Sequence, residues 1–159
     1  MNYFELFDIP VSVNIDQNKL SKKFFELQKK YHPDFFVNAT EAEQEEALQN
    51  SSEANKALKI FRNEDQTIKY VLQLKGLLEE EEKYQLPPDF LMEMMELNEE
   101  LSGDTPIQIA ELEKRLRSEV LSIIDNYHDE STTTAQLLQV KEYYYKKKYL
   151  QRILERLGD

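Results

Sequence analysis

A single proline divides the first half of this sequence into two long amphipathic stretches. Pro33 lacks a backbone N–H group and disfavours a helical conformation in the residue before it, so a helix running up to Tyr31 should end there. Before the proline, apolar residues recur at spacings of four, three and four, the period of one helical face; they are Leu20, Phe24, Leu27 and Tyr31. The sequence therefore predicts two antiparallel helices joined by a short turn that exposes His32 and Asp34.

The rest of the chain shows helical patterns as well. Among 159 residues only 3 are glycine and 5 are proline, which favours long helices over a turn-rich β fold. Asp16 is a plausible N-cap for the first arm, and Thr40, followed by Glu43, has the capping-box pattern for a second arm that runs to about Arg62. Further helices are expected over residues 2–7, 65–78, 89–101, 107–127 and after the polar loop 129–134.

Apolar stripes on these helices identify the expected core. The second arm should bury Ala47, Ala54, Leu58 and Phe61. The next helix offers Ile68, Tyr70, Val71, Leu72 and Leu74. The long helix after residue 106 has a regular bundle stripe of Ile109, Leu112, Leu116, Val120, Ile123 and Tyr127. The last helix should bury Val140, Tyr143, Leu150, Leu154 and Leu157, with Tyr145, Tyr149 and Ile153 on another face.

Composition excludes several classes of function. The chain has no cysteine, which excludes disulfides, thiolate metal sites and cysteine nucleophiles. The net charge of −11 is concentrated in residues 76–159, which hold 19 acidic and 10 basic side chains, so neither nucleic acid nor an anionic membrane is expected as a partner. Because the sequence shows neither a membrane-spanning apolar run nor a leader pattern, we expect a cytoplasmic protein.

The turn at residues 32–34 does not have the surroundings of an active site. His32 and Asp34 could form a general base pair, but no nucleophile or oxyanion site is visible near them. His32 and His128 fall in different predicted domains, and no acidic cluster completes a metal ligand set. The sequence therefore predicts a recognition element without enzymatic activity, metal or cofactor.

A basic face leads directly into this turn. Five lysines of the first arm fall in one sector with only Glu26 among them; they are Lys19, Lys22, Lys23, Lys29 and Lys30. Such a face is often only a solvated surface. Its continuity with His32-Pro33-Asp34 favours docking of an acidic protein partner by electrostatic steering.

The helix expected at residues 89–101 has more apolar residues than one core stripe requires. Phe90, Met94, Leu97 and Leu101 share one face, while Leu91, Met92 and Met95 lie elsewhere, beside Glu96 and Glu99. Two interpretations stay open: burial on both sides inside a bundle, or a partner-binding patch of flexible methionines edged by carboxylates. Tyr145 is either a half-buried packing residue or part of the same patch.

These features resemble a known family. A helix with a basic outer face, then His-Pro-Asp, then a second antiparallel helix is typical of the J domain, which docks onto heat-shock chaperone ATPases of the DnaK class and stimulates their ATP hydrolysis. The sequence is more closely similar to the HscB family, the J-type co-chaperones of iron–sulfur cluster biogenesis, and looks like a bacterial form because it lacks the cysteine-rich zinc module and targeting segment of eukaryotic relatives. The similarity is carried by residues 1–7, 27–34, 55–57 and 90–93.

The resemblance implies a role for each matching residue. Stimulation of the chaperone would require His32, Pro33 and Asp34. Docking would be helped by Lys22, Lys23, Lys29 and Lys30. The cluster scaffold protein IscU would bind to Leu91, Met92, Met95, Glu96 and Glu99, with an aromatic residue at Tyr145.

The implied architecture is all-α, with a J domain over residues 1–76, a linker over 77–87 and, packed to the J domain, a C-terminal three-helix bundle over 88–159. The implied function is that of a co-chaperone that stimulates a DnaK- or HscA-type chaperone and delivers IscU to it during iron–sulfur cluster assembly and transfer. Two alternatives stay open: a J-domain co-chaperone with a different client, and a helical structural adaptor in which His-Pro-Asp is incidental.

Overall fold

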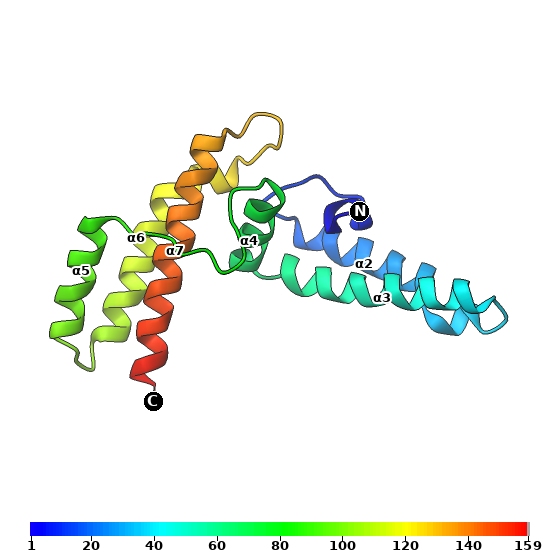
Figure 1. The fold of residues 1–159 in the computed structure, drawn as a ribbon, viewed down its shortest axis with the longest axis horizontal. Helices are drawn as coiled ribbons and strands as arrows, with labels where there is room; N and C mark the ends of the chain where they lie inside the picture. The colour runs from blue at the N-terminus through cyan, green and yellow to red at the C-terminus, as the bar shows by residue number, and fades with distance from the viewer. Residues whose placement is uncertain (159) are drawn as a thin grey trace. The chain divides into compact units, whose positions relative to one another are not determined.

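The computed structural model describes residues 1–158, which form seven α-helices, a short 3-10 helix and no strand (Figure 1). The elements are α1 (Tyr3–Phe7), α2 (Gln17–Tyr31), η1 (Pro33–Phe36), α3 (Glu41–Phe61), α4 (Glu64–Leu74), α5 (Pro88–Glu99), α6 (Thr105–Asp125) and α7 (Thr134–Leu157). The all-α class predicted from the sequence is confirmed. The chain divides into two compact units between Val71 and Leu72, and no helix within residues 1–158 is long and apolar enough to cross a membrane.

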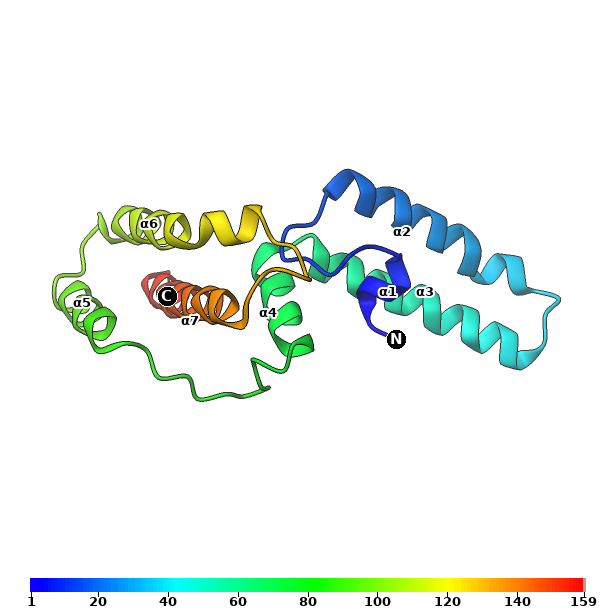
Figure 2. The ribbon, with the colours of Figure 1, turned by 90° about the horizontal axis from the view of Figure 1, so that it is seen from above.

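In the first unit, α2 and α3 lie side by side as a hairpin (Figures 1 and 2). The carboxylate of Asp16 accepts hydrogen bonds from the backbone N–H groups of Asn18 and Lys19 in the first turn of α2. The helix ends at Tyr31, immediately before His32 and Pro33. Thr40 caps α3 by accepting from the N–H of Glu43 at 3.2 Å. The reciprocal bond of a capping box is replaced by one from the Thr40 hydroxyl to the Glu43 carboxylate, at 3.1 Å.

Small side chains let the two arms approach closely. Ala47, Ala54, Leu58 and Phe61 are buried on α3, as predicted. On α2 only Leu20 is buried, whereas Phe24, Leu27 and Tyr31 are half-buried. A hairpin of two helices covers one side of each arm only, so a stripe that would be fully buried in a bundle stays partly in contact with water.

Aromatic rings close the base of the hairpin. Phe4 of α1 packs on Phe61 of α3 with ring centroids 4.7 Å apart, and Tyr3 stacks on Tyr70 of α4 at 5.1 Å. The Tyr3 hydroxyl donates to the Glu53 carboxylate at 2.9 Å. Burial, together with this carboxylate, raises the pKa of Tyr3 to about 12. These contacts join α1, α3 and α4 into one small core.

Helix α4 ends four residues earlier than predicted. Gly76 has a φ of +72°, the left-handed conformation that glycine adopts at little cost. The N–H groups of Gly76 and Leu77 donate to the carbonyl oxygens of Gln73 and Leu72 at 3.0 and 2.8 Å, the pattern of a Schellman cap. The helix therefore stops at Leu74, which is exposed and was wrongly predicted to lie in the core.

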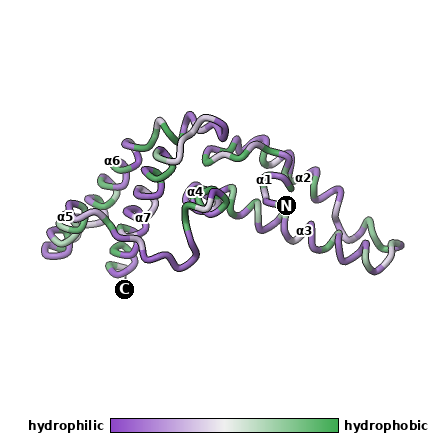
Figure 3. Tube along the Cα trace, turned by 45° about the horizontal axis from the view of Figure 1, so that its top comes forward, coloured by the Kyte–Doolittle hydropathy of each residue, from purple (hydrophilic) through white to green (hydrophobic). Residues whose placement is uncertain are grey.

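The second unit contains a bundle of α5, α6 and α7, in which hydrophobic residues recur at intervals along α6 and α7 (Figure 3). The α6 stripe is confirmed at Ile109, Leu116, Val120 and Ile123, which are buried. On α7, Val140, Tyr143 and Leu150 are buried as predicted. Ile153, which was placed on another face, is only 3% exposed. Helix α5 also packs on α7, through Phe90 and Tyr149. Helix α7 is therefore covered on more than one side, which accounts for the burial of Ile153.

Candidate partner-binding surfaces

The tip of the hairpin presents a short, constrained turn. His32 ends α2 and caps η1, and Pro33 is the first residue of η1. The backbone N–H of Asp34 donates to Nδ1 of His32 at 3.2 Å, so the proton of the neutral imidazole is on Nε2. The Asp34 carboxylate lies 3.6 Å from the same Nδ1. Since all three side chains are exposed, the turn offers one N–H donor and one carboxylate to a partner.

A glutamine of α3 holds the loop that follows the turn. The side-chain amide of Gln44 donates to the backbone carbonyl oxygens of Phe36, Val37 and Ala39 at 2.9, 3.2 and 3.4 Å. These bonds tie the loop to the first turn of α3 and limit its freedom next to His32. Sequence analysis missed Gln44, because no spacing rule connects a helix side chain with carbonyl groups five to eight residues away.

The predicted basic face is only partly free. Lys22, Lys29 and Lys30 are exposed on α2. Lys23 is half-buried, and its ammonium lies 3.6 Å from the Asp8 carboxylate. This carboxylate neutralises part of the positive charge of Lys23 within the chain. The ammonium of Lys29 lies 4.8 Å from the ring centroid of Phe25, whose side chain is exposed as well. This face therefore combines positive charge with an aromatic surface.

On α5, one apolar face points into the bundle and a second is exposed. Phe90 and Met94 are buried, whereas Leu91, Met92 and Met95 are 39%, 62% and 62% exposed. Glu96 and Glu99 are exposed on the same helix. The structure thus removes one of the two interpretations of this helix, because its second apolar group is not covered within the described residues.

Tyr145 is a half-buried residue of α7 with partners from the segment before α5. Its ring stacks on Tyr84 with centroids 4.4 Å apart and an angle of 7° between the planes. Burial, reinforced by the Glu82 carboxylate, raises the pKa of Tyr145 to about 12. The contact of α7 with α5 is made one turn further along, where Tyr149 meets Phe90 at 6.0 Å. One face of the Tyr145 ring is therefore occupied within the chain.

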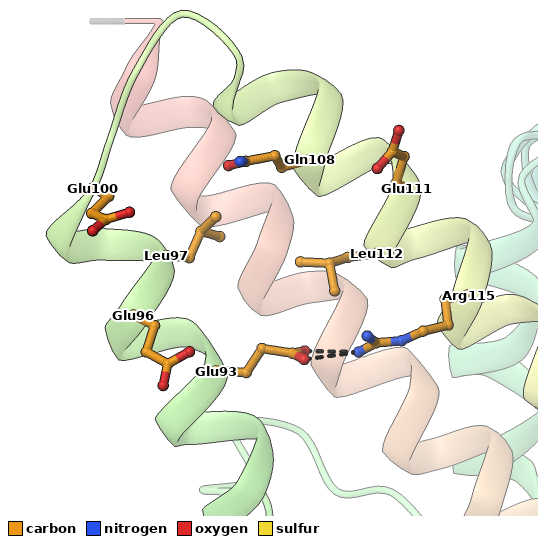
Figure 4. A pocket seen from close by; sticks show the side chains of 8 residues that line it. All are labelled: Glu93, Glu96, Leu97, Glu100, Gln108, Glu111, Leu112 and Arg115. Carbon is orange, nitrogen blue, oxygen red and sulfur yellow. Dashed lines mark hydrogen bonds and ion pairs between the residues drawn. The ribbon is translucent and has the colours of Figure 1, made fainter.

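A groove of about 480 Å³ lies between α5 and α6 (Figure 4). Its floor is formed by Leu97 and Leu112, and an ion pair between Glu93 and Arg115, at 2.8 Å, crosses it. The remaining lining is polar and mostly acidic: Glu96, Glu100, Gln108 and Glu111. With four carboxylates and one guanidinium, the groove is unsuited to an anionic ligand. Within residues 1–158, no three histidine, aspartate or glutamate side chains are grouped so that they could hold a metal ion.

A helical hairpin with His-Pro-Asp at its tip, joined in sequence to a three-helix bundle, defines the class of J-domain proteins with a C-terminal helical domain. Comparison with known proteins agrees with this class. The sequence model of the HSCB C-terminal oligomerisation domain matches residues 86–158. The structure of the human co-chaperone protein HscB superposes with a TM-score of 0.77 and 26% identity, over 99% of this chain and 81% of the human one. Chaperone HscB from Vibrio cholerae gives a TM-score of 0.60 and 27% identity, over 99% of both chains.

Curated sequences give the same result. A co-chaperone protein HscB homolog from Colwellia psychrerythraea is 37% identical over 129 residues, which are 77% of this chain and 74% of the relative. The homolog from Vibrio cholerae serotype O1 (strain M66-2) is 40% identical over 106 residues, which are 66% of this chain but only 62% of the relative. The chain belongs to the HscB co-chaperone family.

Proposed function

We propose that this protein stimulates the ATPase of a DnaK- or HscA-type heat-shock chaperone and delivers an IscU-type iron–sulfur scaffold protein to it in the cytoplasm, assisting cluster assembly and transfer. The observation that carries the proposal is the constrained, exposed turn His32-Pro33-Asp34 at the end of a lysine-bearing helix. Lys22, Lys29 and Lys30, with a smaller contribution from Lys23, steer an acidic surface of the chaperone towards the turn. The imidazole and carboxylate then make directed hydrogen bonds with little loss of conformational entropy.

The scaffold is proposed to bind the exposed side of α5. Leu91, Met92 and Met95 supply an apolar centre whose flexible thioethers adapt to the partner. Glu96 and Glu99 supply a charged rim, and Tyr145 contributes from α7. This combination of an apolar centre and a polar rim is the usual anatomy of a protein interface.

The mechanism brings two proteins together and performs no bond chemistry of its own. With the scaffold on the bundle and the chaperone on the hairpin, the meeting of scaffold and chaperone becomes effectively intramolecular. Stimulated ATP hydrolysis then closes the chaperone on the scaffold. Both the hydrolysis and the cluster chemistry belong to the partners, and the protein itself is not an enzyme.

Steady-state ATP hydrolysis tests the first half of the proposal. The purified chaperone and scaffold are titrated with the wild type, with His32→Gln and with a matched control, His128→Gln, which changes the other, also exposed, histidine. We expect stimulation by the wild type and His128→Gln and none by His32→Gln at equal helicity. Equal stimulation by all three would place the activity elsewhere, and none by any, with a chaperone of verified activity, would support a structural adaptor.

Scaffold binding is tested by calorimetry. The double variant Leu91→Ala/Met95→Ala is compared with Leu138→Ala, which removes an exposed leucine from α7. We expect the double variant to lose more than about 1 kcal/mol of binding free energy and Leu138→Ala to lose little. Unchanged affinity in the double variant would show that the α5 surface is not the scaffold-binding site. If the wild-type protein stimulates the chaperone but does not bind the scaffold, the client is a different protein.

A further inference from the structure

Two side chains from the segment before α5 and one from the first turn of α5 meet α7 at residues spaced by four. Glu82 pairs with Lys141, Tyr84 stacks on Tyr145, and Phe90 packs against Tyr149. A spacing of four places the three α7 residues on one face of the helix. Residues 82–84, which we call the strap, therefore contact the same face of α7 on which the start of α5 packs.

The ion pair of the strap is well shielded from water. The Lys141 ammonium lies 2.8 and 3.0 Å from the two carboxylate oxygens of Glu82. The two side chains are only 12% and 22% exposed, respectively. The hydrogen bond from Lys141 lowers the pKa of Glu82. Glu82 is thus held as an anion at the surface of α7.

The aromatic stack fixes Tyr84, two residues further along the strap. The rings of Tyr84 and Tyr145 are nearly parallel, and the Tyr145 hydroxyl interacts with Glu82 as well. The Lys141 ammonium lies 5.5 Å from the centroid of the Tyr84 ring, so one lysine contacts both Glu82 and Tyr84. Tyr144 meets the edge of Tyr145 at 5.2 Å. Contacts from several directions leave the Tyr145 ring little freedom to rotate.

Little chain separates the strap from α5. Only Gln85, Leu86 and Pro87 lie between Tyr84 and the first residue of the helix, Pro88. The two prolines restrict the backbone at this point. No side chain caps the beginning of α5 through a hydrogen bond. The strap therefore holds the chain on α7 shortly before the helix begins, and Phe90 holds the first turn of the helix itself.

We infer that Tyr84 and Glu82 are positioning residues for the exposed surface of α5: their contacts with Tyr145 and Lys141 determine where the helix starts on α7 and which way its Leu91, Met92 and Met95 face. The consequence for scaffold affinity rests on the proposed function, whereas the consequence for α5 does not. Tyr84 makes no contact with the scaffold in this scheme. It acts by keeping the apolar surface and Tyr145 in a binding-competent arrangement before the partner arrives.

Methyl NMR tests the position of α5 without any partner. The chain has 4 methionines, of which Met92, Met94 and Met95 are on α5 and Met1 is distant in sequence. In full-length protein with ¹³C-methyl methionine, Tyr84→Ala should shift or broaden the signal of Met94, which is fully buried in the bundle. Tyr84→Phe keeps the stacked ring and should restore the wild-type spectrum. Tyr127→Ala removes a half-buried tyrosine that is bonded to Asp129, outside the strap, and should leave Met94 unchanged.

Scaffold affinity provides the second measurement. At a temperature where every variant is fully folded by circular dichroism, Tyr84→Ala and Glu82→Gln should bind about fivefold or more weakly, and Tyr84→Phe should match the wild type. An unchanged Met94 signal in Tyr84→Ala would overturn the inference. So would a displaced α5 with unchanged affinity, because the strap would then serve stability only. If no variant, including the wild type, binds the scaffold, the proposed function fails and the methyl spectra alone decide the role of the strap.

Discussion

Gln28 of α2 and Ser51 of α3 exchange hydrogen bonds across the hairpin. The Ser51 hydroxyl donates to Oε1 of Gln28 at 3.0 Å, and the Gln28 amide nitrogen donates to the Ser51 carbonyl oxygen at 3.5 Å. Ser51 is buried, in line with the small residues Ala47 and Ala54 on the same helix. The pair therefore fixes the relative register of the two arms at a point where their backbones are close.

Removing this pair should destabilise the hairpin. Ser51→Ala leaves the Gln28 oxygen without its donor, and we expect a loss of about 1 kcal/mol in the free energy of unfolding. Ser52→Ala is the matched control, because Ser52 is exposed on the same helix. Urea denaturation followed by circular dichroism measures both. Equal stability of the two variants would show that the hydrogen bonds between Gln28 and Ser51 do not contribute to the free energy of unfolding.

Gln44 should control the order of the tip. In Gln44→Ala the carbonyl groups of residues 36, 37 and 39 lose their common donor, so amide hydrogen exchange at Phe35 and Ala39 should become faster. Chaperone stimulation should fall with it, since the turn must then be ordered on docking. Gln49→Ala, an exposed change further along α3, is the control. Wild-type exchange rates in Gln44→Ala would contradict this role.

Gly76→Ala should destabilise the end of α4. A side chain at a φ of +72° is strained, although no atom lies within 4 Å of the added Cβ, and the expected cost is about 1 to 2 kcal/mol. Gly103 has equally open surroundings without a positive φ, so Gly103→Ala should change stability little. Thermal unfolding of both variants makes the comparison. Similar midpoints would mean that the turn relaxes to a conformation that alanine tolerates.

The ion pair between Glu82 and Lys141 should make the free energy of unfolding depend on pH. Its pKa is lowered from an ordinary value of 4.5 by the bond from Lys141, so the ion pair contributes fully above that value and is lost as the pH falls through the lowered pKa. The wild type should exceed Glu82→Gln by about 1 kcal/mol or less near neutral pH, and the two should converge in acid. Urea titrations at several pH values test this, with the exposed Glu80→Gln as control. A difference that is independent of pH would assign the effect to packing.

Local rules predicted where most helices begin and end, but they did not predict every boundary. Asp16 and Pro33 set the ends of α2 because each acts on its own neighbours. At the end of α4, apolar residues continue the helical pattern past Leu74, but the left-handed Gly76 closes the helix first. The sequence does not reveal that the φ of Gly76 is positive, so the end of the helix at Leu74 was not predicted.

The candidate surfaces were accessible to sequence reasoning only in part. His32, Pro33 and Asp34 were found because they are contiguous, and Leu91, Met92 and Met95 because they share a helical face. Periodicity assigns residues to faces but does not say which face is covered, so exposure on α5 required the structure. Gln44 and Tyr84 were missed because their partners lie elsewhere in the chain, at separations that no helical or turn rule describes.

Because α2 and α3 approach each other closely, the angle between them determines the position of the tip of the hairpin. Ala54 is fully buried where the arms meet, and at about 1.5 Å per residue it lies roughly 20 Å from the start of α3 beside the tip. A branched side chain at Ala54 would push α2 and α3 apart. Even a small change in the angle between the two helices would then displace the tip over that length. We therefore expect substitutions of Ala54 to change the position of His32, although the two residues are far apart.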